Sequence, residues 1–243
     1  MEEKRIGGLL KFFDRDDYFD QLLGGLVYFN TSESYRRDSR EGRADLNESC
    51  AFAFRKERGD PPIQVSFAGQ EIKEVLSLTM HNGGQKDGWL HCWCAIVLPS
   101  RLDELRQFKN ALDRMQAEFG RRYVFLPGNR IKQFAARIQN NLPSESTDIV
   151  KHGLVRYSAS KDDWTVWCKS QAYAYQQEYR FVIGECEHTD TTAKRITCPA
   201  GFDTILFPEP TVRIHGEEAE EVLLELDANG CRVTAGGLSE GKA

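Results

Sequence analysis

Residues 8–31 carry the pattern that decides the fold: GLLKFF at 8–13 and LVYFNT at 26–31 lie on either side of a short mixed segment. Both outer stretches are short apolar runs of the kind found in buried strands. Between them, Asp16 is expected to cap a helix that ends at the glycine pair following residue 23. The opening of the chain therefore predicts a strand, a helix and a second strand.

The remaining sequence alternates strand-like segments with two longer helices. Apolar residues recur every three or four positions between 102 and 119, which predicts an amphipathic helix that starts at Ser100 and ends at Gly120. A second helix is expected over 131–140. Further apolar segments, most of them strands, are expected at 63–67, 72–80, 89–97, 122–126, 154–157, 164–168, 179–183, 202–207 and 231–234, with a last helix at 217–226. This order predicts an α+β protein with mixed or antiparallel sheets and a few helices.

The composition sets limits on the class of protein. The chain has 243 residues, of which 28% are charged and 40% are hydrophobic, and its formal net charge is -5. These values are typical of a globular protein and argue against one that coats DNA nonspecifically, because such a protein needs an excess of basic residues. No apolar run is long enough for a transmembrane helix. The 7 cysteines have no regular spacing, which indicates reduced thiols and a cytoplasmic location without membrane association.

Cys92 and Cys94 lie close together in an apolar run that also contains His91, and cysteine and histidine are the residue types that bind zinc. On a strand the two thiols share one face and His91 points the other way. No second pair of ligands stands at a recognisable distance. We therefore interpret this run as a buried strand and expect no metal.

A charged stretch over 33–48 contains Arg36, Arg37, Arg40 and Arg43 among aspartates and glutamates. It has few apolar residues and is expected on the surface. One interpretation is a solvated segment held by ion pairs. The other is a mobile loop that binds an anionic ligand, because arginine binds phosphate and carboxylate groups in a bidentate manner.

The segment 169–181, KSQAYAYQQEYRF, is the most unusual in the chain. On an extended backbone Gln176, Glu178 and Arg180 share one face, while Tyr179 and Phe181 lie on the other. The second face is core-like. The first places an amide, a carboxylate and a guanidinium in a row, either as a solvated strand face or as a carboxylate held in a cleft.

This segment resembles the C-terminal signature of a widespread bacterial family of uncharacterised proteins, Lys…Tyr-x-x-Gln-x-Glu-Tyr-Arg. Members begin with a strand–helix–strand unit followed by a loop rich in Arg, Asp and Glu. The matching stretches in this chain are 10–12, 26–29, 35–36, 43–48, 119–134 and 153–157. The resemblance covers about residues 8–185.

The layout also resembles, more distantly, the ADP-ribosyltransferase fold. Those enzymes have a basic residue on a first strand, a Ser-Thr-Ser-type second strand and a late Gln/Glu-x-Glu motif. The resemblance implies one domain over 1–243, with the transferase-like core at about 8–207 and a helix–strand extension at 208–243. It implies a catalytic set of Lys11, Ser32, Gln176 and Glu178. It further implies that NAD is held by residues among Thr31, Tyr28, Arg36, Arg37, Arg43 and Tyr175. Lys11 replaces the usual Arg or His, and 30–32 match only in part.

The implied reaction breaks the nicotinamide–ribose bond of NAD, which is a substrate here. Glu178 would stabilise an oxocarbenium-like species, by analogy with glycosidic cleavage, and Gln176 would orient the acceptor. Lys11 or one of the arginines would hold the pyrophosphate, and Tyr28 or Tyr175 would stack on a base. The resemblance also implies a toxin or phage-defence effector, with a macromolecular acceptor and a possible antitoxin or defence-system partner protein.

Two other functions remain open from the residues. A metal-dependent nuclease would use Asp45, Glu48 and Glu178, with Lys169 and Arg180 as basic helpers. A non-catalytic module would bind a nucleotide or a partner through the charged stretch. The sequence has no Gly-x-Gly-x-x-Gly, Walker A or Gly-x-Ser-x-Gly pattern, which speaks against Rossmann, P-loop and serine-hydrolase sites.

Overall fold

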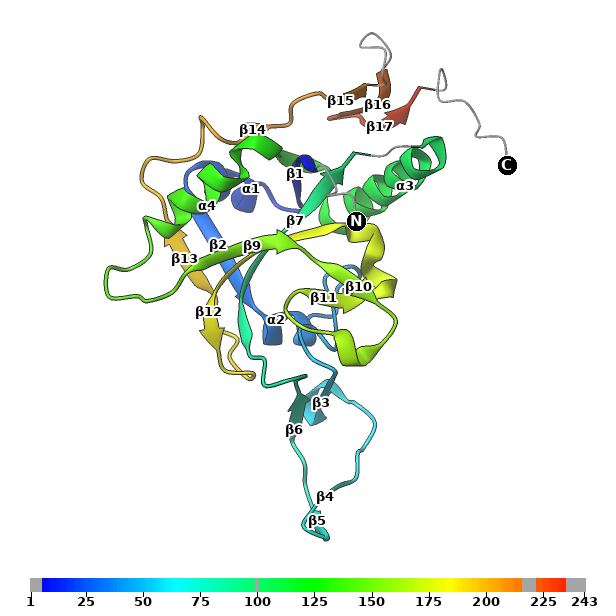
Figure 1. Ribbon diagram of the computed structural model, residues 1–243, viewed down its shortest axis with the longest axis vertical. Coiled ribbons are helices and arrows are strands. Elements are labelled where there is room, and N and C mark those ends of the chain that lie inside the picture. The colour runs from blue at the N-terminus through cyan, green and yellow to red at the C-terminus, as the bar shows by residue number, and fades with distance from the viewer. Residues whose placement is uncertain (1–5, 99–100, 216–221, 235–243) are drawn as a thin grey trace.

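The computed structural model describes residues 6–98, 101–215 and 222–234, and the expected α+β class is confirmed (Figure 1). The helices are α1 (Asp16–Leu23), α2 (Ser32–Arg37), α3 (Leu102–Phe119) and α4 (Ile131–Gln139). The main sheet has the order β13 (Lys194–Thr197), β2 (Leu26–Thr31), β7 (Asp87–Val97), β1 (Ile6–Phe13), β8 (Arg122–Pro127) and β14 (Phe207–Pro208). In addition, β12 (Glu178–Cys186) pairs with β7, and β9 (Val150–Leu154) pairs with the far edge of β12. The smaller sheets pair β3 (Phe52–Arg55) with β6 (Ser77–Met80), β4 (Val65–Phe67) with β5 (Gln70–Ile72), β10 (Arg156–Ser158) with β11 (Cys168–Ser170), and β15 (Val212–His215) with β16 (Val222–Asp227) and β17 (Gly230–Val233).

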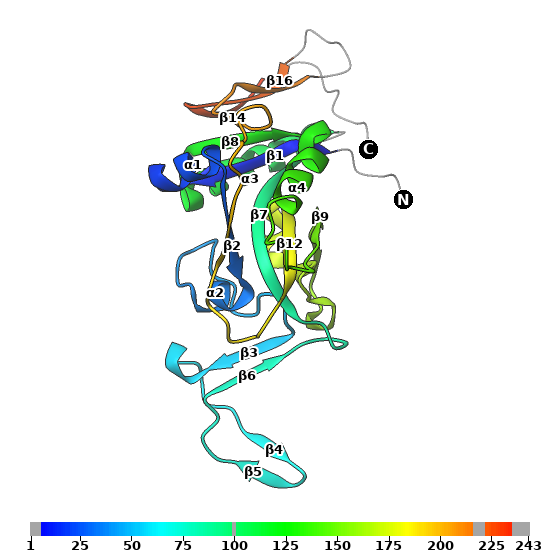
Figure 2. The same cartoon turned by 90° about the vertical axis from the view of Figure 1, so that its left-hand side faces the viewer.

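The long strand β7 joins the parts of the main sheet. One of its edges pairs with β12. The opposite edge is divided: β2 pairs with Trp89 and Leu90, whereas β1 pairs with 94–97. Figure 2 shows β1 running across the molecule below β8 and β16, while β2 runs down beside β7. The two strands therefore diverge from one edge of β7, and residues 91–93 face the gap between them.

Each face of the sheet carries its own hydrophobic core. Leu9 and Leu10 are adjacent on β1 and fully buried, yet they belong to opposite cores, because successive side chains on a strand point to opposite faces. The first core packs α1 and α4 against the sheet and is rich in aromatic rings. The second packs α3 and the β15–β17 sheet against the other face.

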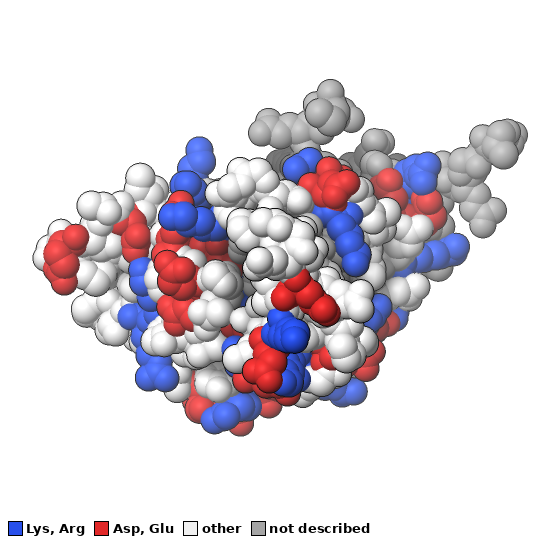
Figure 3. All heavy atoms as spheres, turned by 90° about the horizontal axis from the view of Figure 1, so that it is seen from below, with Lys and Arg blue, Asp and Glu red and all other residues white. Residues whose placement is uncertain are grey.

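An arm extends from this body and is formed by the β3–β6 ribbon with the β4–β5 hairpin beyond it (Figures 1 and 2). Val65 pairs with Ile72 and Phe67 with Gln70, so the apolar side chains of the hairpin share a face. Phe67 is 78% exposed. On the face of the molecule that looks along the arm, positive and negative side chains are intermixed, without a broad basic patch (Figure 3).

Most of the predicted elements are confirmed. The strand–helix–strand opening is present as β1, α1 and β2, although Arg15 is the N-cap of α1 and Asp16 is its first helical residue. The helix predicted to end at Gly120 ends at Phe119, and Gly120 has a φ of 102°, which a glycine adopts without strain. Its predicted start at Ser100 lies outside the described residues.

Three predicted elements are wrong in whole or in part. The strand predicted at 72–80 is interrupted, since β5 ends at Ile72 and β6 begins at Ser77. Residues 202–206 form a bend and turns rather than a strand, because the buried side chains Phe202, Ile205 and Leu206 follow a helical spacing, and only Phe207 belongs to a strand, β14. The predicted helix 217–226 is a strand where the structure describes it. There, β16 pairs on both sides, which buries Leu224 and Leu226. Residues 217–221 lie outside the described part of the chain.

The expectation that 33–48 lies on the surface is also wrong for several charged residues. Glu33, Arg36, Asp45 and Glu48 are buried. Each has a partner of opposite charge far away in the sequence, which offsets the cost of burial; these partners are Arg55, Asp87, Lys169 and Arg180, respectively.

Within the described residues, no helix combines the length and the apolar character needed to cross a membrane.

We predict that Phe134→Ala lowers the free energy of unfolding by about 3–5 kcal/mol, because it leaves a cavity in the first core. The Phe134 ring is fully buried and lies 4.8 Å from that of Phe202 and 5.1 Å from that of Phe181, between ring centroids. The exposed Phe67→Ala is the matched control and should change stability by less than about 0.5 kcal/mol. Urea unfolding followed by circular dichroism measures both, and equal losses would contradict this account of the core.

Candidate functional site

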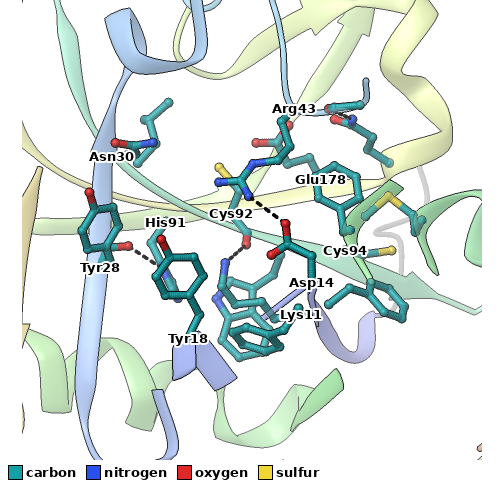
Figure 4. A pocket seen from close by; sticks show the side chains of 18 of the residues that line it. Lys11, Asp14, Tyr18, Tyr28, Asn30, Arg43, His91, Cys92, Cys94 and Glu178 are labelled. Atoms are coloured by element: carbon teal, nitrogen blue, oxygen red, sulfur yellow. Dashed lines mark hydrogen bonds and ion pairs between the residues drawn. The ribbon is translucent and has the colours of Figure 1, made fainter. Parts of the chain in front are cut away.

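A cavity of about 310 Å³ lies where β1 and β2 diverge from β7 (Figure 4). Strand β1 contributes Lys11, β2 contributes Tyr28 and Asn30, and β7 contributes Cys92. The loop after α2 and the start of β12 close it from the other side. Its volume is at the small end of the range for ligand sites in proteins.

Lys11 fills part of the gap in the sheet. Its Nζ atom donates a hydrogen bond of 2.8 Å to the Cys92 carbonyl oxygen, which faces the divided edge of β7 between the residues paired with β2 and those paired with β1. Burial lowers the pKa of Lys11 to about 8. At the floor of the cavity, the Lys11 ammonium group thus donates the hydrogen bond that the backbone of a neighbouring strand would otherwise give to Cys92.

Glu178, the first residue of β12, lies at the same cavity and is 5% exposed. Its carboxylate accepts a hydrogen bond of 2.6 Å from Arg180 Nε and one of 3.2 Å from Lys169 Nζ. Burial alone would raise the pKa of Glu178, but the charges of Arg180 and Lys169 hold it well below its ordinary value. Glu178 is therefore ionised at neutral pH.

These residues belong to a buried charge cluster made of Asp45, Glu48, Lys169, Glu178 and Arg180. Arg180 is fully buried and also pairs with Glu48 at 2.8 Å. Lys169 Nζ lies 3.2 Å from Glu178, 3.5 Å from Glu48 and 3.8 Å from Asp45. Burial and the nearby Glu48 raise the pKa of Asp45 to about 6. The carboxylates of the cluster surround the Lys169 ammonium.

Gln176 connects this cluster to the wall of the cavity. It belongs to a 3-10 helix (Gln171–Gln176) rather than to the strand, although its side chain still reaches the same side as Glu178. Its Nε2 atom donates to the Gly42 carbonyl at 2.7 Å, and its Oε1 atom accepts from Lys169 at 3.2 Å. Both ends of the Gln176 amide are thus used in contacts within the protein, and one of these contacts holds the loop after α2 in place.

The outer part of the cavity is lined by aromatic and charged side chains. Tyr18 and Tyr28 are both 42% exposed and stand on the same side of the opening (Figure 4). Asp14, Arg40 and Arg43 also line it. The buried carboxylates of Glu48 and Glu178 lie deeper in the cavity and are paired with Arg180 and Lys169. The aromatic faces and the cations of the outer part suit a ligand with rings and negative charge.

The structure brings together only some of the predicted site residues. Glu178, Gln176, Lys11, Tyr28 and Arg43 line the cavity. The predicted site residues that do not line it are Ser32, Thr31, Arg36, Arg37 and Tyr175.

These five residues outside the cavity have other contacts. Thr31 caps α2 by accepting from Ser34 N, and Ser32 donates to Ser49. Tyr175 donates to Glu118. Arg37 pairs with Glu33 and Glu57.

Arg36 belongs to a second buried cluster, which also contains Glu33, Arg55 and Asp87. Glu33 accepts from Arg36 at 2.8 Å and from Arg55 at 2.6 Å, and Arg36 also pairs with Asp87 at 2.5 Å. This cluster fixes α2 to β3 and β7, and its guanidinium donors are used inside the protein.

Sequence reasoning missed Asp14, Tyr18 and Asn30, which also line the cavity. Cys92 was considered only as a metal ligand, but its thiol lies 3.9 Å from the Tyr35 hydroxyl beside the cavity. No local pattern separates these residues from ordinary surface or core residues, because the divided edge of β7 places them together.

Across the described residues, no group of three or more His, Cys, Asp or Glu side chains is placed to hold a metal ion. His91 points into the first core, away from Cys92 and Cys94, and its Nδ1 atom is paired with the Tyr28 carbonyl. The acidic residues of the nuclease hypothesis instead surround Lys169, so the geometry offers that hypothesis no support.

The chain matches no known protein family, no curated protein and no solved structure. The function of the cavity is therefore inferred from the residues that line it.

We predict that Arg180→Gln lowers the free energy of unfolding by about 3–5 kcal/mol, because it leaves Glu48 and Glu178 buried without their main partner. Arg232→Gln is the control, since Arg232 pairs with Glu225 and Asp227 at an exposed site and should matter by less than about 1 kcal/mol. Denaturant unfolding of both variants measures the difference. Equal losses in the free energy of unfolding would show that the buried ion pairs of Arg180 matter no more for stability than the exposed ones of Arg232.

We also predict a pH dependence from Lys11. Its pKa is about 8 in the folded protein and near 10.5 in an unfolded chain, so the unfolded state binds more protons between these values. The stability of the wild type, relative to Lys11→Met, should therefore rise as the pH increases from about 8 to 10.5. Urea unfolding across this range measures the difference, and Lys56→Met, an exposed lysine, controls for the loss of a charge. A difference that falls with pH would contradict the lowered pKa.

Proposed function

We propose that this chain binds NAD in the cavity, cleaves its nicotinamide–ribose bond and transfers ADP-ribose to a macromolecular acceptor. The observation that carries the proposal is the ionised carboxylate of Glu178 at a cavity that opens where the sheet divides, with Lys11 on the opposite strand. The cavity has room for one half of a dinucleotide, and the other half would lie at the rim beside Arg40 and Arg43.

The chemistry follows from the charge that develops during cleavage. As the bond breaks, nicotinamide leaves with the bonding electron pair and becomes neutral, while the ribose becomes oxocarbenium-like. A nucleophile of the acceptor then forms the new bond to the ribose C1′ and releases its proton to solvent. A fixed carboxylate that hydrogen-bonds a ribose hydroxyl stabilises this positive charge. Glu178 Oε1 and Oε2 already accept from Arg180 and Lys169, but a carboxylate has about four lone-pair sites and retains capacity for a hydroxyl.

The supporting residues take narrower roles than the resemblance implies. Gln176 keeps the loop after α2 against β12, which positions the cavity wall rather than the acceptor. Tyr28 supplies an exposed ring for stacking on a base. We leave Ser32, Thr31, Arg36, Arg37 and Tyr175 out of the proposed site, because they do not line the cavity.

A second candidate is a module that binds the nucleotide without cleaving it. It is favoured by the observation that both oxygens of Glu178 are already paired with cations. This candidate predicts NAD binding without release of nicotinamide. The biological role as a toxin or defence effector, with an antitoxin-like partner, comes from the resemblance and applies to either candidate.

We predict that the purified protein releases nicotinamide from NAD and that Glu178→Gln reduces the rate by about 100- to 1,000-fold, because a preorganised charge is lost at the ribose. Glu185→Gln, which changes an exposed carboxylate on the same strand, should retain the wild-type rate. Chromatography of nicotinamide measures the rate, and thermal unfolding of each variant shows that it is folded.

A folded Glu178→Gln variant with the wild-type rate would exclude Glu178 as the catalytic carboxylate. A wild-type protein that binds NAD without releasing nicotinamide would favour the second candidate.

A further inference from the structure

Arg43 differs from the other arginines of the interior in how its guanidinium is used. Arg36, Arg55 and Arg180 direct their donors to carboxylates and carbonyls at hydrogen-bond distance. The Arg43 guanidinium, 24% exposed, makes no hydrogen bond within the described part of the chain. Its nearest carboxylates are Asp38 at 3.7 Å and Asp14 at 3.8 Å. Arg43 therefore presents a set of N–H donors at the cavity without strong partners.

The backbone around Arg43 is nevertheless held in place on both sides. Gln176 Nε2 donates to the Gly42 carbonyl at 2.7 Å, and the Tyr173 hydroxyl donates to the Ala44 carbonyl at 2.7 Å. Both donors come from the 3-10 helix that precedes Glu178. The guanidinium is thus carried by a fixed loop, which is the arrangement expected of a preorganised binding group.

Asp14 lies within 4 Å of the guanidinium groups of both Arg43 and Arg40 at the same wall, and Figure 4 shows it beside Arg43. Its Oδ2 atom is 3.8 Å from Arg43 and 3.9 Å from Arg40, too far for a hydrogen bond in either case. Arg40 is anchored separately by Asp38 at 2.6 Å. Because the Asp14 side chain is 38% exposed, it can turn into solvent without leaving a buried charge behind.

We propose that Arg43 and Arg40 form a subsite for the phosphate groups of a nucleoside diphosphate, and that the bound phosphate displaces Asp14 from its position beside them. The inference rests on the proposed function for the identity of the dinucleotide, whereas the subsite itself takes any ligand that carries the same diphosphate.

The chemistry favours phosphate over the internal carboxylate. A diphosphate carries more negative charge than one aspartate and offers several oxygens to a planar guanidinium, so that bidentate hydrogen bonds replace two long ion pairs. In the absence of ligand, Asp14 and Asp38 together balance the charge of the two arginines, and Asp14 is the more exposed of the two carboxylates. Asp14 therefore lowers the affinity for anions and excludes those that bind weakly.

The test is calorimetric titration of the full-length protein with ADP, and with adenosine as the ligand that lacks phosphate. We expect ADP to bind the wild type at least about tenfold more tightly than adenosine, and Arg43→Gln to weaken ADP binding by about 10- to 100-fold. Arg121→Gln removes an exposed arginine outside the cavity and should leave the ADP affinity within about twofold of the wild type. Circular dichroism shows that each variant is folded.

Asp14→Asn tests the second part of the inference. Removing the competing charge should tighten ADP binding by about three- to tenfold and leave adenosine binding unchanged. Weaker ADP binding in this variant would overturn the displacement of Asp14. Equal affinities of the wild type and Arg43→Gln for ADP, or equal affinities of the wild type for ADP and adenosine, would overturn the subsite.

These outcomes are separate from those of the proposed reaction. A protein that binds ADP through Arg43 but releases no nicotinamide from NAD retains the subsite and loses the proposed activity. A protein that releases nicotinamide while Arg43→Gln leaves ADP affinity unchanged retains the activity and loses the subsite.

Discussion

The site depends on how the protein holds the guanidinium of Arg180, a full charge that has no exposure to solvent. Burying such a group costs several kcal/mol unless it is paired and hydrogen-bonded, and the two carboxylates that satisfy it come from β12 and from the loop after α2. That loop is therefore bound to β12 by the need to neutralise Arg180. The same contacts fix the carboxylate of Glu178 in its ionised form and set one wall of the cavity.

The second buried cluster applies the same constraint to α2. There Arg36 pairs with Glu33 and Asp87, and Glu33 also pairs with Arg55, so the cluster joins α2, β3 and β7. Neither cluster can form from a local segment, because the charges meet only after the strands have paired. The burial of the stretch 33–48 therefore depends on contacts of high sequence separation, whose loop-closure entropy must be paid before they form.

Sequence reasoning succeeded where the signal is local. The spacing in α3 and α4, the opening strand–helix–strand and the alternation of Glu178 with Tyr179 and Phe181 are all present in the structure. It failed where pairing with distant residues decides the outcome. The burial of the charged stretch required Asp87, Lys169 and Arg180, and the strand at β16 required two neighbours. The cavity itself arises from the divided edge of β7. No local pattern in the sequence predicts that β1 and β2 share this edge.

The walls of this cavity come from segments far apart in the chain: β1 on one side, and the loop after α2 with the start of β12 on the other. A ligand that touches both acts as a clamp that exists only in the folded state. At a hundred times its dissociation constant, such a ligand adds about 2.7 kcal/mol to the free energy of unfolding, or roughly 5–10 °C in melting temperature for a chain of this length. The rise in melting temperature with each of a series of nucleotides and other small anions therefore ranks the affinity of the cavity for them. This ranking does not depend on which reaction follows binding.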